Sequence, residues 1–168
     1  MTRTAAREIA VRLCFALAIG NADPLEAFER FFEREYFEGL AQEDKLFSEF
    51  PDEKQMDYIR RIVIGVAEHR EELDNYIQKY SKGWKLGRIS RVAAAILRCA
   101  IFEILYMEDV PDAAAINEAV ELAKGYEEKE TVAFINGVLG GFARGEIEGG
   151  GELQDGGEGI PTEDTEDV

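Results

Sequence analysis

The sequence predicts an all-α fold, and three observations carry this prediction. Apolar residues recur at steps of three and four along most of the chain, which is the spacing of one helix face. No run of alternating β-branched residues indicates a strand. Apolar residues make up 46% of the 168 residues, so one domain of ordinary size can form a packed core without disulfides or metal.

The first half of the chain contains two predicted helices and an irregular connection. An apolar stripe predicts a helix over about residues 4–19, ending at a Gly-Asn pair that suits a left-handed stop. Asp23 followed by Pro24 is typical of an N-cap with proline at the first helical position. We expect the helix that follows to reach about Tyr36, and residues 39–51 to form a less regular connection.

The second half shows stronger helical spacing. Ser90 caps the most apolar segment, residues 92–106, which is apolar nearly all round and is therefore expected to be the central helix. Gly65 lowers helix propensity and indicates either close approach of a neighbouring helix or simple tolerance. Trp84 falls in a short connector. The other predicted helices cover residues 52–70, 73–80, 113–126 and 130–142. The helix over residues 73–80 is either a separate helix or a bent continuation of the one before it.

The charge of the chain is distributed unevenly. The formal net charge is −16, yet nine Asp or Glu and no Lys or Arg follow Arg144. The first 145 residues carry 26 acids and 19 bases, a net charge of −7. We therefore predict one helical domain over residues 1–145 and a disordered, acidic, Gly-rich tail over residues 146–168.

Catalytic, metal and cofactor signals are missing from the sequence. Cys14 and Cys99 lie far apart in apolar helical patterns, as reduced core thiols of a cytoplasmic protein do, and His69 is the single histidine. No Gly-rich phosphate loop, Cys-x-x-Cys, His-Glu-x-x-His or triad pattern occurs. Glu8 and Arg12 interrupt the apolar run near the N-terminus, and no stretch has the length of a membrane span. We expect a binding protein without cofactor, metal, catalysis or membrane.

The first predicted helix carries a candidate pattern for single-stranded RNA. Arg3 and Arg7 are four residues apart and share a face, and Phe15 lies close to the same side. Cations for phosphates beside a flat ring for base stacking are what single-stranded RNA requires. An exposed arginine pair beside a core phenylalanine explains the same residues, and the pattern by itself leaves both interpretations open.

Two later stretches, residues 116–124 and 134–139, combine helical spacing with unusual polar residues. Glu121 and Lys124 are expected to form a weak surface pair. Phe134 fits a core position. Asn136 and Gly137 are poor helix formers, which suggests a buried amide and close helix packing, respectively.

Taken together, these segments resemble the transcription antitermination factor NusB family. The likeness extends over about residues 3–142. The matching segments are Ala6-Arg7-Glu8 with Phe15, Ile64-Gly65-Val66, Leu73-Asp74, Ile96-Leu97-Arg98-Cys99-Ala100 with Glu103-Ile104, Asp109-Val110-Pro111, and the stretches 116–124 and 134–139.

The resemblance implies about seven helices in two small bundles and a role in transcription. Members of the family bind the boxA element of single-stranded RNA as a heterodimer with NusE, a small-subunit ribosomal protein. This complex joins other Nus factors on RNA polymerase and promotes antitermination on ribosomal RNA operons. Some members form homodimers, so a homodimer is an open alternative. The resemblance implies RNA contacts at Arg3, Arg7, Phe15, Phe134 and Asn136.

Several positions depart from the family's pattern. Ala93 stands where an acidic residue facing NusE is common, and Glu127 and Glu130 replace a Gly and part of an Asp-Ser pair. These departures leave open a helical protein-interaction module with weakened RNA binding. NusB-like domains also occur at the start of certain ribosomal RNA cytosine methyltransferases, so the NusB-like part of such an enzyme is a second alternative. The acidic tail is compatible with a solubilising extension and with a competitor with RNA for Arg3 and Arg7.

Overall fold

The computed structural model describes residues 1–84 and 86–148, and the predicted tail from residue 149 onward lies outside these residues. Within them the chain forms eight α-helices and no strand, which confirms the all-α prediction with one helix more than expected. Their bounds are α1 (Arg3–Ile19), α2 (Pro24–Phe31), α3 (Arg34–Leu40), α4 (Glu53–Glu68), α5 (Arg70–Tyr80), α6 (Arg91–Tyr106), α7 (Asp112–Lys124) and α8 (Lys129–Phe142). Three shorter helical turns are η1 (Lys45–Phe47), η2 (Leu86–Arg88) and η3 (Ala143–Glu148).

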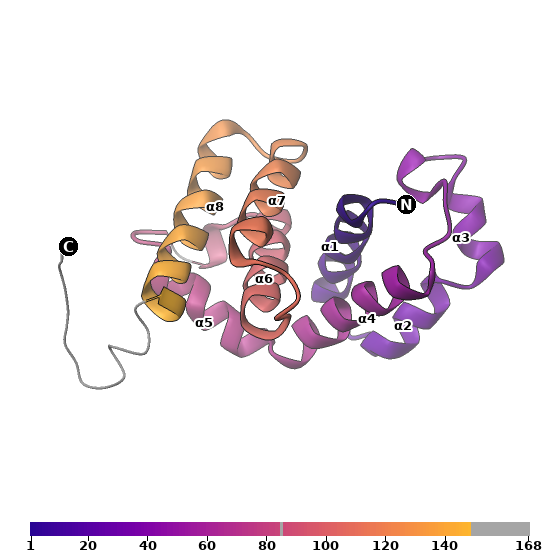
Figure 1. The fold of residues 1–168 in the computed structure, drawn as a ribbon, viewed down its shortest axis with the longest axis horizontal. Helices are drawn as coiled ribbons and strands as arrows, with labels where there is room; N and C mark the ends of the chain where they lie inside the picture. Colours follow the sequence, from indigo (N-terminus) through magenta and orange to yellow (C-terminus); the bar gives the residue numbers. More distant parts are fainter. Residues whose placement is uncertain (85, 149–168) are drawn as a thin grey trace.

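The helices form two groups that share one helix. Figure 1 shows α1 to α4 on one side and α5 to α8 on the other. Helix α6 packs against α1 and α4 of the first group and against α5, α7 and α8 of the second. Its residues 93–104 are all buried, and the core is one continuous cluster. The predicted central helix therefore packs against both groups and contributes to the core of each.

Side chains cap the starts of three helices, and the sequence predicts two of these caps, Asp23 and Ser90. The Asp23 carboxylate accepts a hydrogen bond from the Glu26 N–H at 3.0 Å, and the Ser90 hydroxyl accepts one from the Ala93 N–H at 3.0 Å. Asp52 and Gln55 form a reciprocal capping box at the start of α4. Each cap satisfies backbone donors that a helix start leaves without a partner.

The prediction of one helix from Pro24 to about Tyr36 is wrong, because the helix ends at Phe31 and a second helix starts at Arg34. Phe32 and Phe37 would lie about 140° apart on a straight helix. In the structure their rings stack with centroids 5.6 Å apart, and Phe37 also contacts Phe47 of η1 at 5.6 Å. Burial of this aromatic cluster therefore decides where the helix ends.

Close packing explains Gly65 but not Gly137. A Cβ atom on Gly65 would lie 2.1 Å from the Phe102 ring, so α4 and α6 approach closely only because this side chain is absent. A Cβ atom on Gly137 would meet open space, and the expectation of close packing there is wrong. Helix α4 gives way to α5 at His69, which matches the expected bend before residue 73.

Helix α8 ends at Phe142, as predicted, but helical structure continues after it as η3. Glu146 of η3 accepts hydrogen bonds from Lys79 at 2.6 Å and Tyr80 at 2.5 Å, so residues 146–148 belong to the helical part and not to the tail. None of the described helices is long and apolar enough to cross a membrane.

Candidate nucleic-acid interface

Arg7, predicted as a surface cation, lies in the core. Its guanidinium donates two parallel hydrogen bonds to Glu103 of α6, at 2.9 and 2.7 Å, and 5% of the residue is exposed. The Tyr58 hydroxyl donates to the same carboxylate at 2.9 Å. A buried charge requires such a partner, since desolvation without one is costly. The expectation that Arg7 meets phosphates at the surface therefore disagrees with its placement.

The pKa values in this cluster follow from burial and from Glu103. Burial raises the pKa of Tyr58, and the neighbouring Glu103 charge raises it further. Burial alone would lower the pKa of Arg7, but the hydrogen bonds and the charge of Glu103 outweigh it and raise the pKa. Arg7 and Tyr58 therefore keep their protons, and the cluster fixes α1 against α4 and α6.

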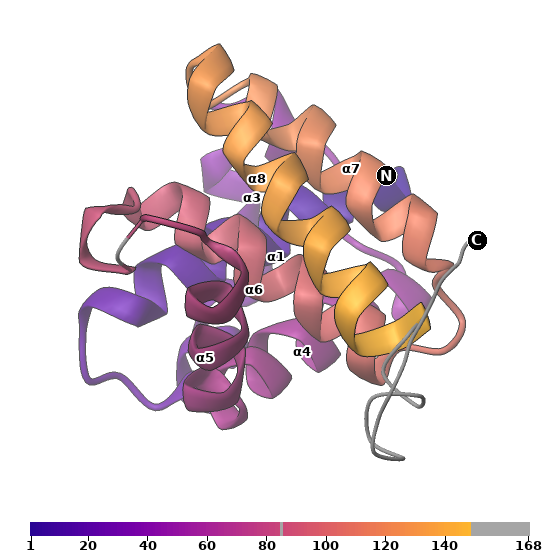
Figure 2. The same cartoon turned by 90° about the vertical axis from the view of Figure 1, so that its left-hand side faces the viewer.

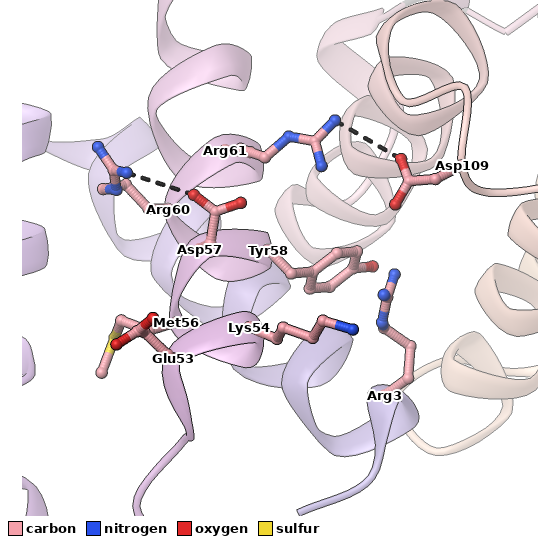
Figure 3. A pocket seen from close by; sticks show the side chains of 9 residues that line it. All are labelled: Arg3, Glu53, Lys54, Met56, Asp57, Tyr58, Arg60, Arg61 and Asp109. Carbon is pink, nitrogen blue, oxygen red and sulfur yellow. Dashed lines mark hydrogen bonds and ion pairs between the residues drawn. The ribbon is translucent and has the colours of Figure 1, made fainter.

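Arg3 lies at the surface, beside the same tyrosine. Its guanidinium carbon is 4.2 Å from the centre of the Tyr58 ring, a cation–π contact. Arg3 and Lys54 converge beside this ring (Figure 3). Among the described residues neither cation forms an ion pair. Two converging cations beside an aromatic ring favour an anion.

The hollow around Arg3 has a volume of about 580 Å³. Its other two cations are paired with acids: Arg60 with Asp57 at 3.3 Å, and Arg61 with Asp109 at 3.6 Å (Figure 3). Lining residues are Arg3, Glu53, Lys54, Met56, Asp57, Tyr58, Arg60, Arg61 and Asp109. The hollow therefore carries four cations and three acids, and its net positive charge is small.

Phe15 lies farther along α1, half-buried against the core. One turn before it, Arg12 donates to the Tyr126 hydroxyl at 2.8 Å and pairs with Asp44 at 2.9 Å. Glu8 contacts both Arg12 and Tyr126. Sequence reasoning missed Arg12 and Tyr126 as a surface unit, since the pair joins residues 114 positions apart.

Helix α7 runs beside α1 in the same direction. Thr4 donates a hydrogen bond to Glu118 at 2.8 Å, and Arg12 donates one to the Tyr126 hydroxyl. Both segments advance by eight residues between these two contacts, so they run in parallel. The Ile116–Lys124 segment is thus scaffold along the exposed side of α1. The predicted weak pair of Lys124 with Glu121 forms at 2.7 Å.

Phe134 and Asn136 lie on different flanks of α8. Two residues turn a helix by about 200°. Phe134 faces the connector between α5 and α6, where its ring stacks on Trp84 with centroids 4.5 Å apart. Asn136 is exposed and lines a groove of about 600 Å³ between α7 and α8, so the expectation of a buried amide is wrong. The structure therefore does not bring these two residues together.

The groove beside Asn136 combines an apolar floor with amides and charges. It is lined by Asn117, Val120, Glu121, Lys124, Glu127, Lys129, Val132, Ala133 and Asn136. Four of its residues belong to the Ile116–Lys124 stretch, and three of these four are polar. The groove holds three lysine or asparagine donors on α7 and α8 besides Asn136, and two acids.

Two of the three positions that depart from the family's pattern, Ala93 and Glu127, have structural roles. Ala93 is fully buried in α6, so at this position the chain presents no side chain to a partner. Glu127 accepts a hydrogen bond from the Ser90 hydroxyl at 2.7 Å and thereby ties the end of α7 to the start of α6. Glu130 is exposed on the first turn of α8. Among the described residues no group of three His, Cys, Asp or Glu is placed to hold a metal ion.

Comparisons with known proteins agree with the fold and the motifs. The NusB family profile matches residues 4–144. A relative from Symbiobacterium thermophilum, named transcription antitermination protein NusB, is 41% identical over 86% of this chain and 91% of its own length. A protein of the same name from Acetivibrio thermocellus is 44% identical over 83% and 87%, respectively. A structure of T. maritima NusB is 28% identical, with a TM-score of 0.65, and covers 86% of this chain and 92% of its own.

Proposed function

The chain belongs to the NusB family, and we propose that it is a transcription antitermination factor that binds boxA single-stranded RNA together with NusE. In this proposal the complex acts with other Nus factors on RNA polymerase in the cytoplasm and supports transcription of ribosomal RNA operons. The observation that carries it is the match to the family over nearly the whole helical domain, residues 4–144. The protein then acts by binding, and no catalytic step is assigned to it.

The exposed surface of α1 supports an RNA contact. Arg3 and Lys54 supply two cations without an acidic partner among the described residues, and the Tyr58 ring lies beside them. Phosphate oxygens would meet the two cations, and Phe15 would offer the edge of an aromatic ring farther along the same helix. Arg7 acts as a positioning residue, because its ion pair with Glu103 fixes the start of α1.

The α8 contacts are assigned to two separate places. Phe134 would meet RNA on the flank that faces the α5–α6 connector, and Asn136 on the flank that faces α7. A single base cannot touch both side chains. An RNA strand that uses both must therefore pass over the first turns of α8, where Glu130 is exposed.

A binding series tests the proposal. We expect boxA RNA to bind more tightly than scrambled RNA of equal length, and NusE to increase the affinity. Because phosphate contacts release counterions, the affinity should fall as salt rises from 50 to 200 mM. Filter binding with and without purified NusE measures both effects. Equal binding of the two RNAs, or no gain from NusE, contradicts the proposal.

A second candidate is a helical protein-interaction module that does not depend on RNA. The buried ion pair of Arg7 favours this candidate, because one of the two cations predicted to bind RNA is paired with Glu103 in the core. The variant Arg3→Ala/Lys54→Ala separates the two functions. Under the first function it weakens boxA binding, and under the second it leaves antitermination in a transcription assay unchanged.

A further inference from the structure

The segment around the α5–α6 connector has the strongest positive charge in the chain. From Asn75 to Phe102 the sequence contains six Lys or Arg and no Asp or Glu, although the whole chain has a net charge of −16. Two of the six cations are already paired with acids. The buried Arg98 forms an ion pair with Asp74 at 2.6 Å, and Lys79 forms one with Glu146 at 2.6 Å. The remaining cations belong to the connector and its two ends.

Three of these cations are exposed and available. Lys82, Arg88 and Arg91 are exposed, and in the part of the chain that the structure describes none of them forms an ion pair. Arg91 also lines a cleft of about 340 Å³ together with Arg70 and Arg98. Gly87 and Ile89 line the same cleft, so the connector leads directly into it.

A specific turn holds Trp84 in the middle of these cations. The buried Ser81 hydroxyl donates to the Trp84 carbonyl at 2.8 Å, and the Trp84 N–H donates to the Ser81 carbonyl at 2.9 Å. Gly83 between them has a φ of +82°, a conformation that favours glycine. The turn therefore fixes the backbone at Trp84.

The indole stacks on Phe134 and is exposed in part. Its ring lies 4.5 Å from that of Phe134 with an angle of 30° between the planes. Yet 37% of Trp84 is exposed, although a large aromatic ring gains most from complete burial. Phe134 supports one face of the indole and leaves aromatic surface uncovered among the cations.

We propose that Trp84, supported by Phe134, stacks on an unpaired base of single-stranded RNA, whose flanking phosphates meet Lys82, Arg88 and Arg91. This inference rests on the proposed function and adds a contact residue to it. An open ring between cations suits a base with its phosphates, since stacking accepts any base and the charge holds the backbone. An apolar protein segment would gain nothing from the three cations.

The arginine-lined cleft offers a path for the strand beyond the indole. Arg91 lines this cleft together with Arg70 and Arg98, and Gly87 of η2 lines it too. Two acids lie nearby: Glu127 is held by Ser90, beside Arg91, and Glu130 lies one turn before Phe134 on α8. We expect a polyanion at Trp84 to reach the cleft by way of η2.

The chain contains one tryptophan, which makes the test direct. Titrating the full-length protein with boxA RNA in the presence of NusE, which must lack tryptophan or be replaced by a tryptophan-free variant, should quench the Trp84 fluorescence. The same RNA annealed to its complement should not quench it, because its bases are paired. Labelled-RNA anisotropy, recorded in parallel, measures binding independently of the indole.

Substitutions separate stacking from simple packing. Trp84→Ala should weaken boxA binding roughly 5- to 100-fold, the effect of losing one base–aromatic stack. Trp84→Phe should retain most of the affinity. Tyr36→Ala, which removes another exposed ring in a segment rich in acids, is the matched control and should change nothing.

The outcomes distinguish this inference from the function on which it rests. If boxA RNA binds by anisotropy while Trp84 fluorescence stays constant, the stacking role is overturned and the proposed function stands. If wild-type protein with NusE binds no boxA RNA, both are overturned. Should Trp84→Ala fail to fold, the wild-type fluorescence titration still decides the question.

Discussion

The two ends of α1 differ in how their positive charge is used. At the N-terminal end, Arg3 has no ion pair among the described residues, but acids from distant parts of the chain neutralise two other arginines: Glu103 binds Arg7, and Asp109 binds Arg61. Near the C-terminal end of α1, at the connector between α5 and α6, the cations Lys82 and Arg88 are exposed and unpaired among the described residues. Figure 2 shows this connector and the N-terminus on opposite sides of the molecule. Local basic residues thus indicate a binding surface only when the fold brings no acid to them.

The largest effect is expected from removing Glu103 at the N-terminal end of α1. The variant Glu103→Ala leaves Arg7 charged and buried without a partner, which should lower the free energy of unfolding by about 3–5 kcal/mol. Urea unfolding followed by circular dichroism measures the change. Glu121→Ala, which breaks the exposed pair with Lys124, is the control and should cost less than about 1 kcal/mol. Equal effects of the two variants would show that Arg7 is not held as described.

The connector is tested by removing two of its cations. Lys82→Gln/Arg88→Gln should reduce the slope of log K against log salt for boxA RNA by about 1.4, because each phosphate contact on a single strand contributes about 0.7. The control Arg30→Gln/Lys45→Gln removes the same charge from exposed sites near α2 and η1. An equal change of slope in both double variants would mean that net charge alone acts.

A smaller effect is expected at the N-terminal end. Arg3→Ala removes one phosphate contact and should reduce the same slope by about 0.7, with little change in stability because Arg3 is exposed. Parallel RNA titrations and thermal melts measure the two quantities. A slope that does not change would remove Arg3 from the interface and leave the connector as the principal cationic contact.

The smallest effect concerns the segment beyond the helical domain. Residues 149–168 contain seven Asp or Glu and no Lys or Arg. Ending the chain at Glu148 should raise RNA affinity about twofold at low salt and less at 0.15 M, where charges are screened beyond about 8 Å. Binding at two salt concentrations measures it. An increase that does not depend on salt would exclude an electrostatic competitor.

Local sequence predicted the elements whose ends depend on local chemistry. The starts of α2, α4 and α6 follow from Asp23, Asp52 and Ser90, whose side chains bond within three residues. The break between α2 and α3 depends on ring contacts between Phe37 and Phe47, which lie on separate elements. No local pattern encodes such contacts, so the split escaped prediction.

The candidate site was predictable in the same unequal way. Arg3 and Phe134 could be found from spacing and resemblance, and both reach the surface at least in part. Arg7 could not be judged, because its partner Glu103 lies 96 residues away. The connector did carry a readable signal, a run of 28 residues with six cations and no acid, but this signal emerges only when charges are counted by segment.

The shared position of α6 also bears on how the molecule opens. Helices α1 and α4 of the first group pack against α6, and so do α5, α7 and α8 of the second group. Neither group therefore keeps a complete core once the other has unfolded. The described helices should therefore lose their amide-exchange protection in one cooperative event, with α1 and α8 exchanging at similar rates in mild denaturant. A partner that binds to either group of helices should then slow amide hydrogen exchange in both groups.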